Sequence, residues 1–185
     1  MSLDLQPVLT GPTLTLRPLR PEDRDALYAV ASDPAIWALH PAHDRHLRPV
    51  FDVLFDESLE SGGALLVADR ASGAAIGSSR FSFRFAEPGE VEIGWTFLAR
   101  GHWGGATNRE LKRLMLSHAF AEVATVMFRV GEDNLRSRRA LEKIGARLTA
   151  RTQLATVAGR EVVHVVYAME RGDFPGSPLY FEAER

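Results

Sequence analysis

The junction between an apolar strand and an amphipathic helix at FLARGHWGGATNRELKRLMLSHAF, residues 97–120, constrains the fold more than any other feature. Two adjacent glycines, Gly104 and Gly105, separate the strand end from the helical pattern. Glycines let the backbone approach a ligand closely, and the first N–H groups of a helix favour an anion. The junction therefore predicts a phosphate cradle or, alternatively, a tight turn in which the glycines only permit the backbone conformation.

The helix after this turn is predicted to begin near 106–108 and to end near Glu122. Its apolar stripe comprises Leu111, Leu114, Met115, His118 and Ala119, and outside the stripe lie Arg109, Lys112 and Arg113. Neither Gly-Lys-Ser/Thr nor the dinucleotide fingerprint follows the preceding strand. These absences disfavour nucleotide triphosphatases and nicotinamide-dependent dehydrogenases.

Alternating and helical patterns along the rest of the chain predict a mixed α/β sheet in one domain, residues 1–185. Strands are expected at 13–17, 64–69, 74–85, 91–97 and 124–130, and on both sides of a turn at 158–159. Further helices are expected at 21–32, 50–60 and 134–145, a loop with short helical pieces at 33–49, and an irregular tail at 172–185.

Charge and composition limit the classes of partner that this chain is expected to bind. The formal net charge is −2, which disfavours nucleic acid, and the 185 residues include no cysteine. We see no signal peptide and no apolar run long enough for a bilayer, so we expect a cytoplasmic protein with no membrane partner. Strand 76–85 is expected to be exposed and to allow a homodimer.

The strand before the glycine turn carries the candidate base. Alternation places Val91, Ile93, Trp95 and Phe97 on a core face, and Glu92, Gly94 and Thr96 on a small, polar face. A carboxylate in a cleft beside a phosphate-binding turn is a candidate general base. The alternative is that Glu92 is a solvated or cross-strand-paired acid.

A third polar segment, GEDNLRSRRALEKIG, ends at Gly145. Asn134 or Asp133 is expected to cap its helix, with Ser137 in the first turn. Leu135, Leu141 and Ile144 are expected to face inward, and Arg136, Arg138, Arg139 and Lys143 outward. By itself this pattern is that of an ordinary capped helix with a basic face.

Together these stretches resemble the GNAT superfamily of Gcn5-related N-acetyltransferases, most closely its RimJ/RimL-like ribosomal-protein N-acetyltransferase branch. The likeness covers 14–27, 90–105, 118–148 and 157–174, and the match N..S...LEKIGA at 134–146 is the most specific. It implies a mixed, mostly antiparallel sheet with splayed central strands and about four flanking helices.

The resemblance also implies acetyl-CoA as donor and a primary amine, on a protein N-terminus or a small molecule, as acceptor. The acceptor would attack directly in a ternary complex, with Glu92 as a water-mediated base. The expected cofactor-binding residues are Phe97, Leu98 and Ala99 for the pantetheine arm, Trp103, Gly104, Gly105, Ala106, Thr107 and Asn108 for the pyrophosphate, and Asn134, Ser137 and Arg139. Trp37, His40 and His43 are expected near the acceptor.

Ala106 and Asn108 depart from the usual glycine turn of this family, although Trp103 and Glu110 fit the branch. A second register takes Gly104, Gly105 and Ala106 as the core of the turn. Two alternatives stay open: a non-catalytic acyl-CoA-binding or regulatory module of the same fold, and a different α/β phosphate binder.

His40, His43 and His46 are spaced three residues apart, as metal ligands sometimes are. Pro41 and the loop composition break a helical register. We therefore expect polar loop histidines and no metal.

Overall fold

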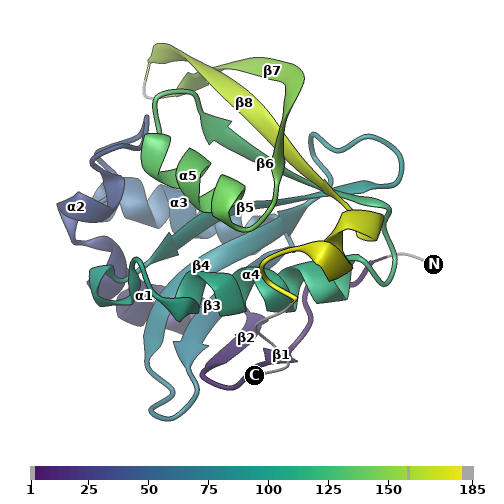
Figure 1. The fold of residues 1–185 in the computed structure, drawn as a ribbon. Helices are drawn as coiled ribbons and strands as arrows, with labels where there is room; N and C mark the ends of the chain where they lie inside the picture. Colours follow the sequence, from purple (N-terminus) through teal and green to yellow (C-terminus); the bar gives the residue numbers. More distant parts are fainter. Residues whose placement is uncertain (1–2, 158, 181–185) are drawn as a thin grey trace.

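The computed structural model describes residues 3–157 and 159–180. Its centre is an eight-stranded sheet with the order β1-β2-β3-β4-β5-β6-β8-β7 (Figure 1). Every neighbouring pair is antiparallel except β5 and β6. The strands are β1 (Leu9–Thr10), β2 (Leu14–Pro18), β3 (Ala64–Asp69), β4 (Ala75–Ser82), β5 (Glu90–Leu98), β6 (Thr125–Gly131), β7 (Arg147–Val157) and β8 (Arg160–Glu170). The predicted mixed, mostly antiparallel sheet is confirmed.

Helices cover both faces of this sheet, with α4 and α5 in front of it and α3 behind it in Figure 1. The helices are α1 (Arg24–Ala31), α2 (Pro34–Trp37), α3 (Arg48–Glu60), α4 (Ala106–Ala119) and α5 (Leu135–Lys143). Short 3-10 turns occupy Pro21–Asp23, Arg100–His102 and Arg171–Gly176. Helix α4 begins where the sequence predicts. It ends at Ala119 rather than Glu122, because residues 120–122 turn toward β6.

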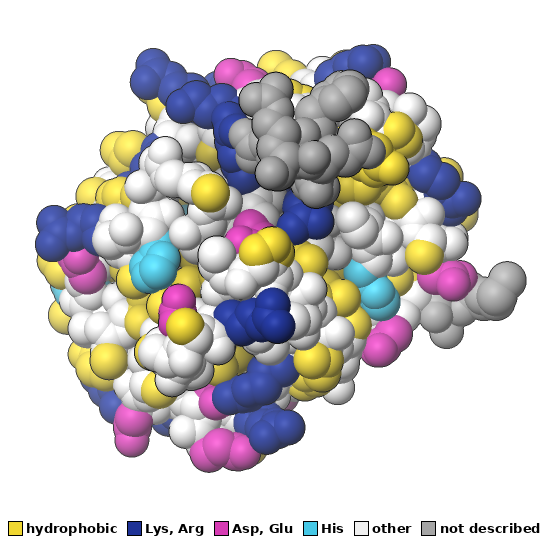
Figure 2. All heavy atoms as spheres, turned by 60° about the horizontal axis from the view of Figure 1, so that its bottom comes forward, with side chains coloured by type: hydrophobic (Ala, Val, Ile, Leu, Met, Phe, Trp, Pro, Cys, Tyr) yellow, Lys and Arg dark blue, Asp and Glu magenta, His cyan; other side chains and the backbone are white. Residues whose placement is uncertain are grey.

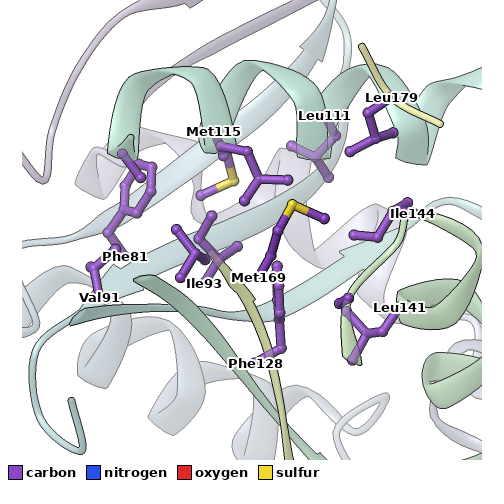
Figure 3. Close-up of a cluster of buried hydrophobic side chains, with 14 of the residues drawn as sticks. Phe81, Val91, Ile93, Leu111, Met115, Phe128, Leu141, Ile144, Met169 and Leu179 are labelled. Atoms are coloured by element: carbon purple, nitrogen blue, oxygen red, sulfur yellow. The ribbon is translucent and has the colours of Figure 1, made fainter. Parts of the chain in front are cut away.

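Two apolar clusters hold the helices on the sheet. Figure 3 shows the larger one, in which Leu111 and Met115 of α4 meet Ile93 of β5 and Phe128 of β6. The second cluster packs α1, α2 and α3 onto the opposite face through Leu27, Trp37, Phe51 and Phe55. Each fully buried side chain of this size contributes about 1.5–3 kcal/mol. The α4 stripe predicted from sequence therefore anchors the turn that precedes it.

The parallel pair at the centre of the sheet opens partway along its length. Strands β5 and β6 pair at Glu90, Val91 and Glu92, opposite residues 125–127. Both strands are fully described, and the ladder between them ends there although β5 runs on to Leu98. The expected splay is present.

A bulge on the other edge of β5 changes which way its side chains point. The register with β4 shifts between Ser78 and Arg80, and Trp95 has a φ of 50°. A bulge adds one residue to a strand and so reverses the alternation beyond it. Val91 and Ile93 are buried in the core, as predicted, in the cluster that contains α4. Trp95 and Phe97 pack on the α3 side, so the prediction of one shared core face is wrong.

Three further expectations are corrected. Strand β4 lies between β3 and β5 and is mostly buried, so the expectation of an exposed strand at 76–85 is wrong for residues 76–81, and the homodimer stays a prediction. Leu135 is 52% exposed because it is the first residue of α5, ahead of the inward face that Leu141 and Ile144 form. The tail is not irregular throughout: it forms the 3-10 turn at Arg171–Gly176, which buries Phe174.

Surface charge on the visible face is mixed. Figure 2 shows basic and acidic side chains interspersed, without a continuous patch of either sign on that face. Among the described residues, none of the helices is both long and apolar enough to cross a membrane. Residue 158 of the predicted turn at 158–159 lies outside the described residues.

Candidate active site

The opened strand pair contains a cavity of about 190 Å³. Its walls include Thr96 and Phe128 from the two strands, Lys112 from α4, and Ser137 from α5. They also include Trp37 and Phe55, which belong to the cluster on the opposite face of the sheet. The cavity therefore runs through the sheet, from the α4 and α5 side to the α1 to α3 side.

The glycine turn stands at the N-terminus of α4, with the helix beginning at Ala106 and Gly105 as its N-cap. Gly104 has a φ of 69°, in the left-handed region that favours glycine, whereas Gly105 has an ordinary φ of −104°. A Cβ placed on either glycine would meet no atom within 4 Å. The first N–H groups of a helix have no intrahelical partner and favour an anion. The backbone at Gly104 and Gly105 is therefore open to a ligand, and Ala106 has no left-handed conformation.

The structure brings together part of the predicted cofactor set. Phe97, Asn108, Asn134 and Ser137 line the cavity. Asn134 caps α5 by accepting a hydrogen bond from the Ser137 N–H at 3.2 Å, as expected. The other predicted residues lie outside the cavity: Trp103, Gly104, Gly105, Ala106 and Thr107 in the turn and first residues of α4, Leu98 and Ala99 at the end of β5, and Arg139 exposed on α5.

The end of β5 is held against the turn by the indole of Trp103. Its Nε1 donates to the Leu98 carbonyl at 2.9 Å, and the Arg136 guanidinium lies 4.2 Å from the centre of its ring. Arg136 also donates to the Ile36 carbonyl at 2.6 Å, which joins α5 to α2. Arg136 is thus half-buried and bonded, although the sequence pattern placed it facing outward.

Glu92 is buried at the last rung of the β5–β6 ladder. Its Oε1 accepts from Arg129 Nε at 3.0 Å, and its Oε2 is buried without a hydrogen-bond partner among the described residues. Burial raises the pKa of the Glu92 carboxyl, against the opposing charge and hydrogen bond of Arg129. The carboxylate is therefore paired across strands and shielded from solvent, next to a cavity that Arg129 lines.

Lys112 is a cavity residue that the sequence pattern assigned to the polar side of its helix. Only 5% of it is exposed, and Nζ donates to Thr96 Oγ1 at 2.8 Å. Desolvation lowers the pKa of the Lys112 amine to about 7. Residues 108, 112 and 116 form a row beside the apolar stripe. Asn108 and Lys112 of that row both line the cavity, although nothing in the sequence pattern distinguishes this lysine from one on the surface.

Two arginines on the α3 side were also missed. Arg80 is 6% exposed, donates to Ser58 Oγ, and stacks its guanidinium 4.4 Å from the ring centre of Trp95. Arg45 lies 3.1 Å from His40 Nε2 through Nη1. Burial lowers the pKa of each guanidinium to about 10. Arg80 sits in an alternating strand where a sequence alone predicts an outward charge.

The predicted acceptor residues Trp37 and His40 both line the cavity. Trp37 is buried, donates from Nε1 to the Ala31 carbonyl at 2.8 Å, and tilts against Phe97. His40 Nδ1 accepts from the Ala42 N–H, and burial with the Arg45 charge lowers its pKa to about 3, so the ring is neutral. His43 is exposed. The described part of the chain places no three His, Cys, Asp or Glu side chains together as a metal-binding group.

The structure thus combines an opened parallel strand pair, a cavity between the two strands, and a glycine turn at the N-terminus of the adjacent helix. The family model described as an acetyltransferase (GNAT) domain matches residues 13–147. The chain therefore belongs to the GNAT acetyltransferase family. None of the curated proteins compared with this chain matches it.

Solved structures share the fold at low sequence identity. A GCN5-related N-acetyltransferase from Brucella melitensis is 20% identical with a TM-score of 0.82, over 97% of this chain and 84% of that one. Mycobacterium smegmatis RimJ, in complex with CoA-disulfide, is 19% identical with a TM-score of 0.71, over 100% and 98%. Spermidine N-acetyltransferase from Vibrio cholerae, in complex with CoA and spermine, is 16% identical with a TM-score of 0.67, over 89% and 99%.

Proposed function

We propose that this chain is an acetyl-CoA-dependent N-acetyltransferase that acts on a primary amine by direct attack in a ternary complex. The observation that carries the proposal is the cavity through the opened β5–β6 pair. Its lining comes from both faces of the sheet, so a donor bound on one face and an acceptor bound on the other would meet in it. The absence of cysteine from the sequence agrees with direct transfer, because a thiol nucleophile is not available.

The donor side is proposed to be the side of α4 and α5. The N–H groups at Gly105, Ala106 and Thr107 would hold the pyrophosphate, and the opened edge of β5 near Phe97 would hold the pantetheine arm. Asn134 and Ser137 would line the thiol end, and Arg139 would approach the adenosine phosphate. Bound there, acetyl-CoA supplies an acetyl group activated as a thioester. The two neighbours whose structures contain CoA or its disulfide support this donor.

The acceptor amine must lose a proton to become nucleophilic. Glu92 is the proposed acceptor of that proton, through water, because it is buried beside the cavity and its pKa is raised. Lys112 is a second candidate, since it lines the cavity and its amine has a pKa of about 7. The two differ in how a pH profile of kcat/KM responds to their removal. If Lys112 takes the proton, a limb near pH 7 disappears in Lys112→Met and remains in Glu92→Gln.

We also propose that the chain belongs to the RimJ/RimL-like branch. The acceptor amine would then be either a protein N-terminus or a small-molecule amine. The RimJ neighbour supports the branch at the level of fold. The spermidine acetyltransferase shows that a similar fold serves a small amine in that other protein.

Release of the CoA thiol from acetyl-CoA, measured over a panel of amines and N-terminal peptides, tests the function. We expect thiol release that needs both acetyl-CoA and one class of amine. Binding of acetyl-CoA without release on any amine would favour the non-catalytic acyl-CoA-binding module of the same fold. Failure to bind CoA together with binding of another phosphorylated ligand would favour a different phosphate binder.

A further inference from the structure

The wall of the cavity is strongly biased in charge. Its lining includes the cationic side chains of Arg45, Arg80, Lys112 and Arg129, and not one aspartate or glutamate among the described residues. Arg129 is neutralised by its ion pair with Glu92. Lys112 belongs to α4, on the other side of the sheet, and desolvation lowers its pKa to about 7, so its amine is only partly charged at neutral pH. Two guanidiniums, Arg45 and Arg80, therefore remain as charges that face the cavity on its α3 side.

Arg80 is built into the wall rather than placed loosely on it. It is 6% exposed, its plane rests 4.4 Å from the Trp95 ring centre, and Nη2 donates to the Ser58 hydroxyl. Its Nε is buried and has no hydrogen-bond partner among the described residues. A buried guanidinium with a free donor is costly unless an acceptor reaches it. Trp95 is brought to this side by the bulge in β5, which fixes the plane of the guanidinium.

Arg45 supplies a second charge near the first. Its Nη1 lies 3.1 Å from His40 Nε2, and its guanidinium lies 5.5 Å from the Trp37 ring centre. Arg45 and Arg80 line the same cavity, and the charge of Arg45 lowers the pKa of Arg80.

Acidic groups act on this pair from outside the cavity wall. Glu57 of α3 is exposed, and its charge raises the pKa of both arginines. The charge of Asp44 raises the pKa of Arg45, and that of Glu92 raises the pKa of Arg80. Neither arginine forms an ion pair within 4.0 Å with a carboxylate of the described chain. Two desolvated guanidiniums favour a carboxylate as ligand, because a carboxylate accepts paired N–H hydrogen bonds. The same two positive charges repel a polycation.

We propose that the acceptor is a small amine that carries a carboxylate, an amino acid or a close analogue, and that Arg80 and Arg45 hold this carboxylate on the α3 side of the cavity. The proposal rests on the acetyltransferase function proposed above. It separates this chain from the neighbour that binds spermine, since a polyamine would bring several positive charges to the two arginines.

The experiment compares each common α-amino acid, β-alanine and γ-aminobutyrate with the matching carboxamide, and adds putrescine, spermidine and a tripeptide with an acidic second residue. Binding is measured by calorimetry on the whole protein with and without CoA, and CoA-thiol release is measured with acetyl-CoA. We expect at least one amino acid to bind at least tenfold more tightly than its carboxamide. Its kcat/KM should exceed those of the carboxamide and the polyamines by a similar factor.

Variants assign the effect to the arginines. Arg80→Gln and Arg45→Gln should each raise the Kd and KM of the amino acid about a hundredfold, while the Kd of acetyl-CoA changes less than threefold. Arg80→Lys keeps the positive charge but not the paired N–H donors of the guanidinium, so it should weaken amino-acid binding less than Arg80→Gln does. The matched control is Arg84→Gln, because Arg84 is exposed and acts on Arg80 only through its charge. Circular dichroism and the melting temperature identify a variant that fails to fold. If Arg80→Gln does not fold, the Kd of the amino acid for Arg80→Lys is compared with that of the parent instead.

Equal binding of amino acids and carboxamides, tighter binding of a polyamine or of the peptide, or no amino-acid binding at all would overturn this proposal. Those results leave the acetyltransferase function standing if another amine releases thiol. Conversely, Arg80-dependent binding of an amino acid without any acetyl-CoA binding would support the carboxylate site and contradict the acetyltransferase function.

Discussion

The Glu92 carboxylate accepts a hydrogen bond from Arg129 Nε at 3.0 Å, and the two side chains are only 2% and 10% exposed. Arg129 also donates to Gln153 Oε1 at 2.6 Å and stacks 3.6 Å from the Phe85 ring centre. The pair closes the ladder between β5 and β6 at the point where the strands part. The pair is therefore a structural element of the opened sheet, and it contains the carboxylate proposed above as the base.

Replacement of Glu92 by Gln keeps the side-chain shape and removes the charge. A general base typically contributes 10²–10⁴-fold, so kcat should fall by about that factor while the Kd of acetyl-CoA changes less than twofold. Steady-state kinetics and calorimetry on the same preparation check this. Equal turnover in both proteins would remove Glu92 from the mechanism.

The free energy of unfolding distinguishes a structural role of the Glu92–Arg129 pair from a catalytic role. Glu92→Gln leaves a buried guanidinium without its counter-charge, which costs on the order of 3 kcal/mol. Glu92→Gln combined with Arg129→Met removes both charges and should recover most of that loss. Urea unfolding of the single and double variants measures it, and additive losses would show that the two side chains are not coupled.

Lys112 makes stability depend on pH above neutrality. The unfolded chain keeps the Lys112 proton up to a pKa near 10.5, whereas the fold keeps it only to about 7. Between these values the unfolded state holds more protons, so the free energy of unfolding rises with pH through this window.

Lys112→Met should remove that slope. We expect the variant to melt several degrees above the parent at pH 6.5, and the difference to shrink as the pH approaches 10. Arg113→Met, one residue further along α4 and half-buried, serves as the control. A difference between Lys112→Met and the parent that is constant from pH 6.5 to 10 would contradict the lowered pKa.

The two glycines of the turn should respond differently to alanine. Gly104 has a φ of 69°, so Gly104→Ala should cost about 1 kcal/mol of stability. Gly105 has a φ of −104°, so Gly105→Ala should cost only the preference of a helix N-cap for glycine over alanine. Because a Cβ at Gly105 points into open space, any effect of Gly105→Ala on acetyl-CoA reports on the ligand. We expect at least fivefold weaker binding by Gly105→Ala, and an unchanged Kd would place the pyrophosphate elsewhere.

Arg139 is expected to recognise the adenosine phosphate. It is exposed on α5, so Arg139→Gln should leave the fold intact. In the parent, dephospho-CoA should bind several-fold more weakly than CoA, and this ratio should approach one in Arg139→Gln. Lys143→Gln, which removes an exposed charge from the same helix, should keep the ratio of the parent.

The sequence predicted the long elements in their order, although not the two-residue strand β1, because apolar residues such as Leu111 and Met115 repeat at helical spacing. It also predicted the glycine turn, in which Gly104 has the left-handed conformation. It misplaced Trp95 and Phe97, because a bulge is decided by pairing with β4 and leaves no mark in the alternation of β5 itself. It also missed Lys112 and Arg80, since a buried cation looks like a surface cation until the neighbouring strands part around it.

Calorimetric titration of the purified protein with acetyl-CoA, alongside CoA and dephospho-CoA, shows whether the glycine turn binds the donor. We expect binding in the micromolar range that weakens without the 3′-phosphate and in Gly105→Ala. Absence of heat with all three ligands, from a protein that is folded by circular dichroism, would contradict it. Ala106 and Asn108 would then mark a turn that keeps the fold of the family without its donor.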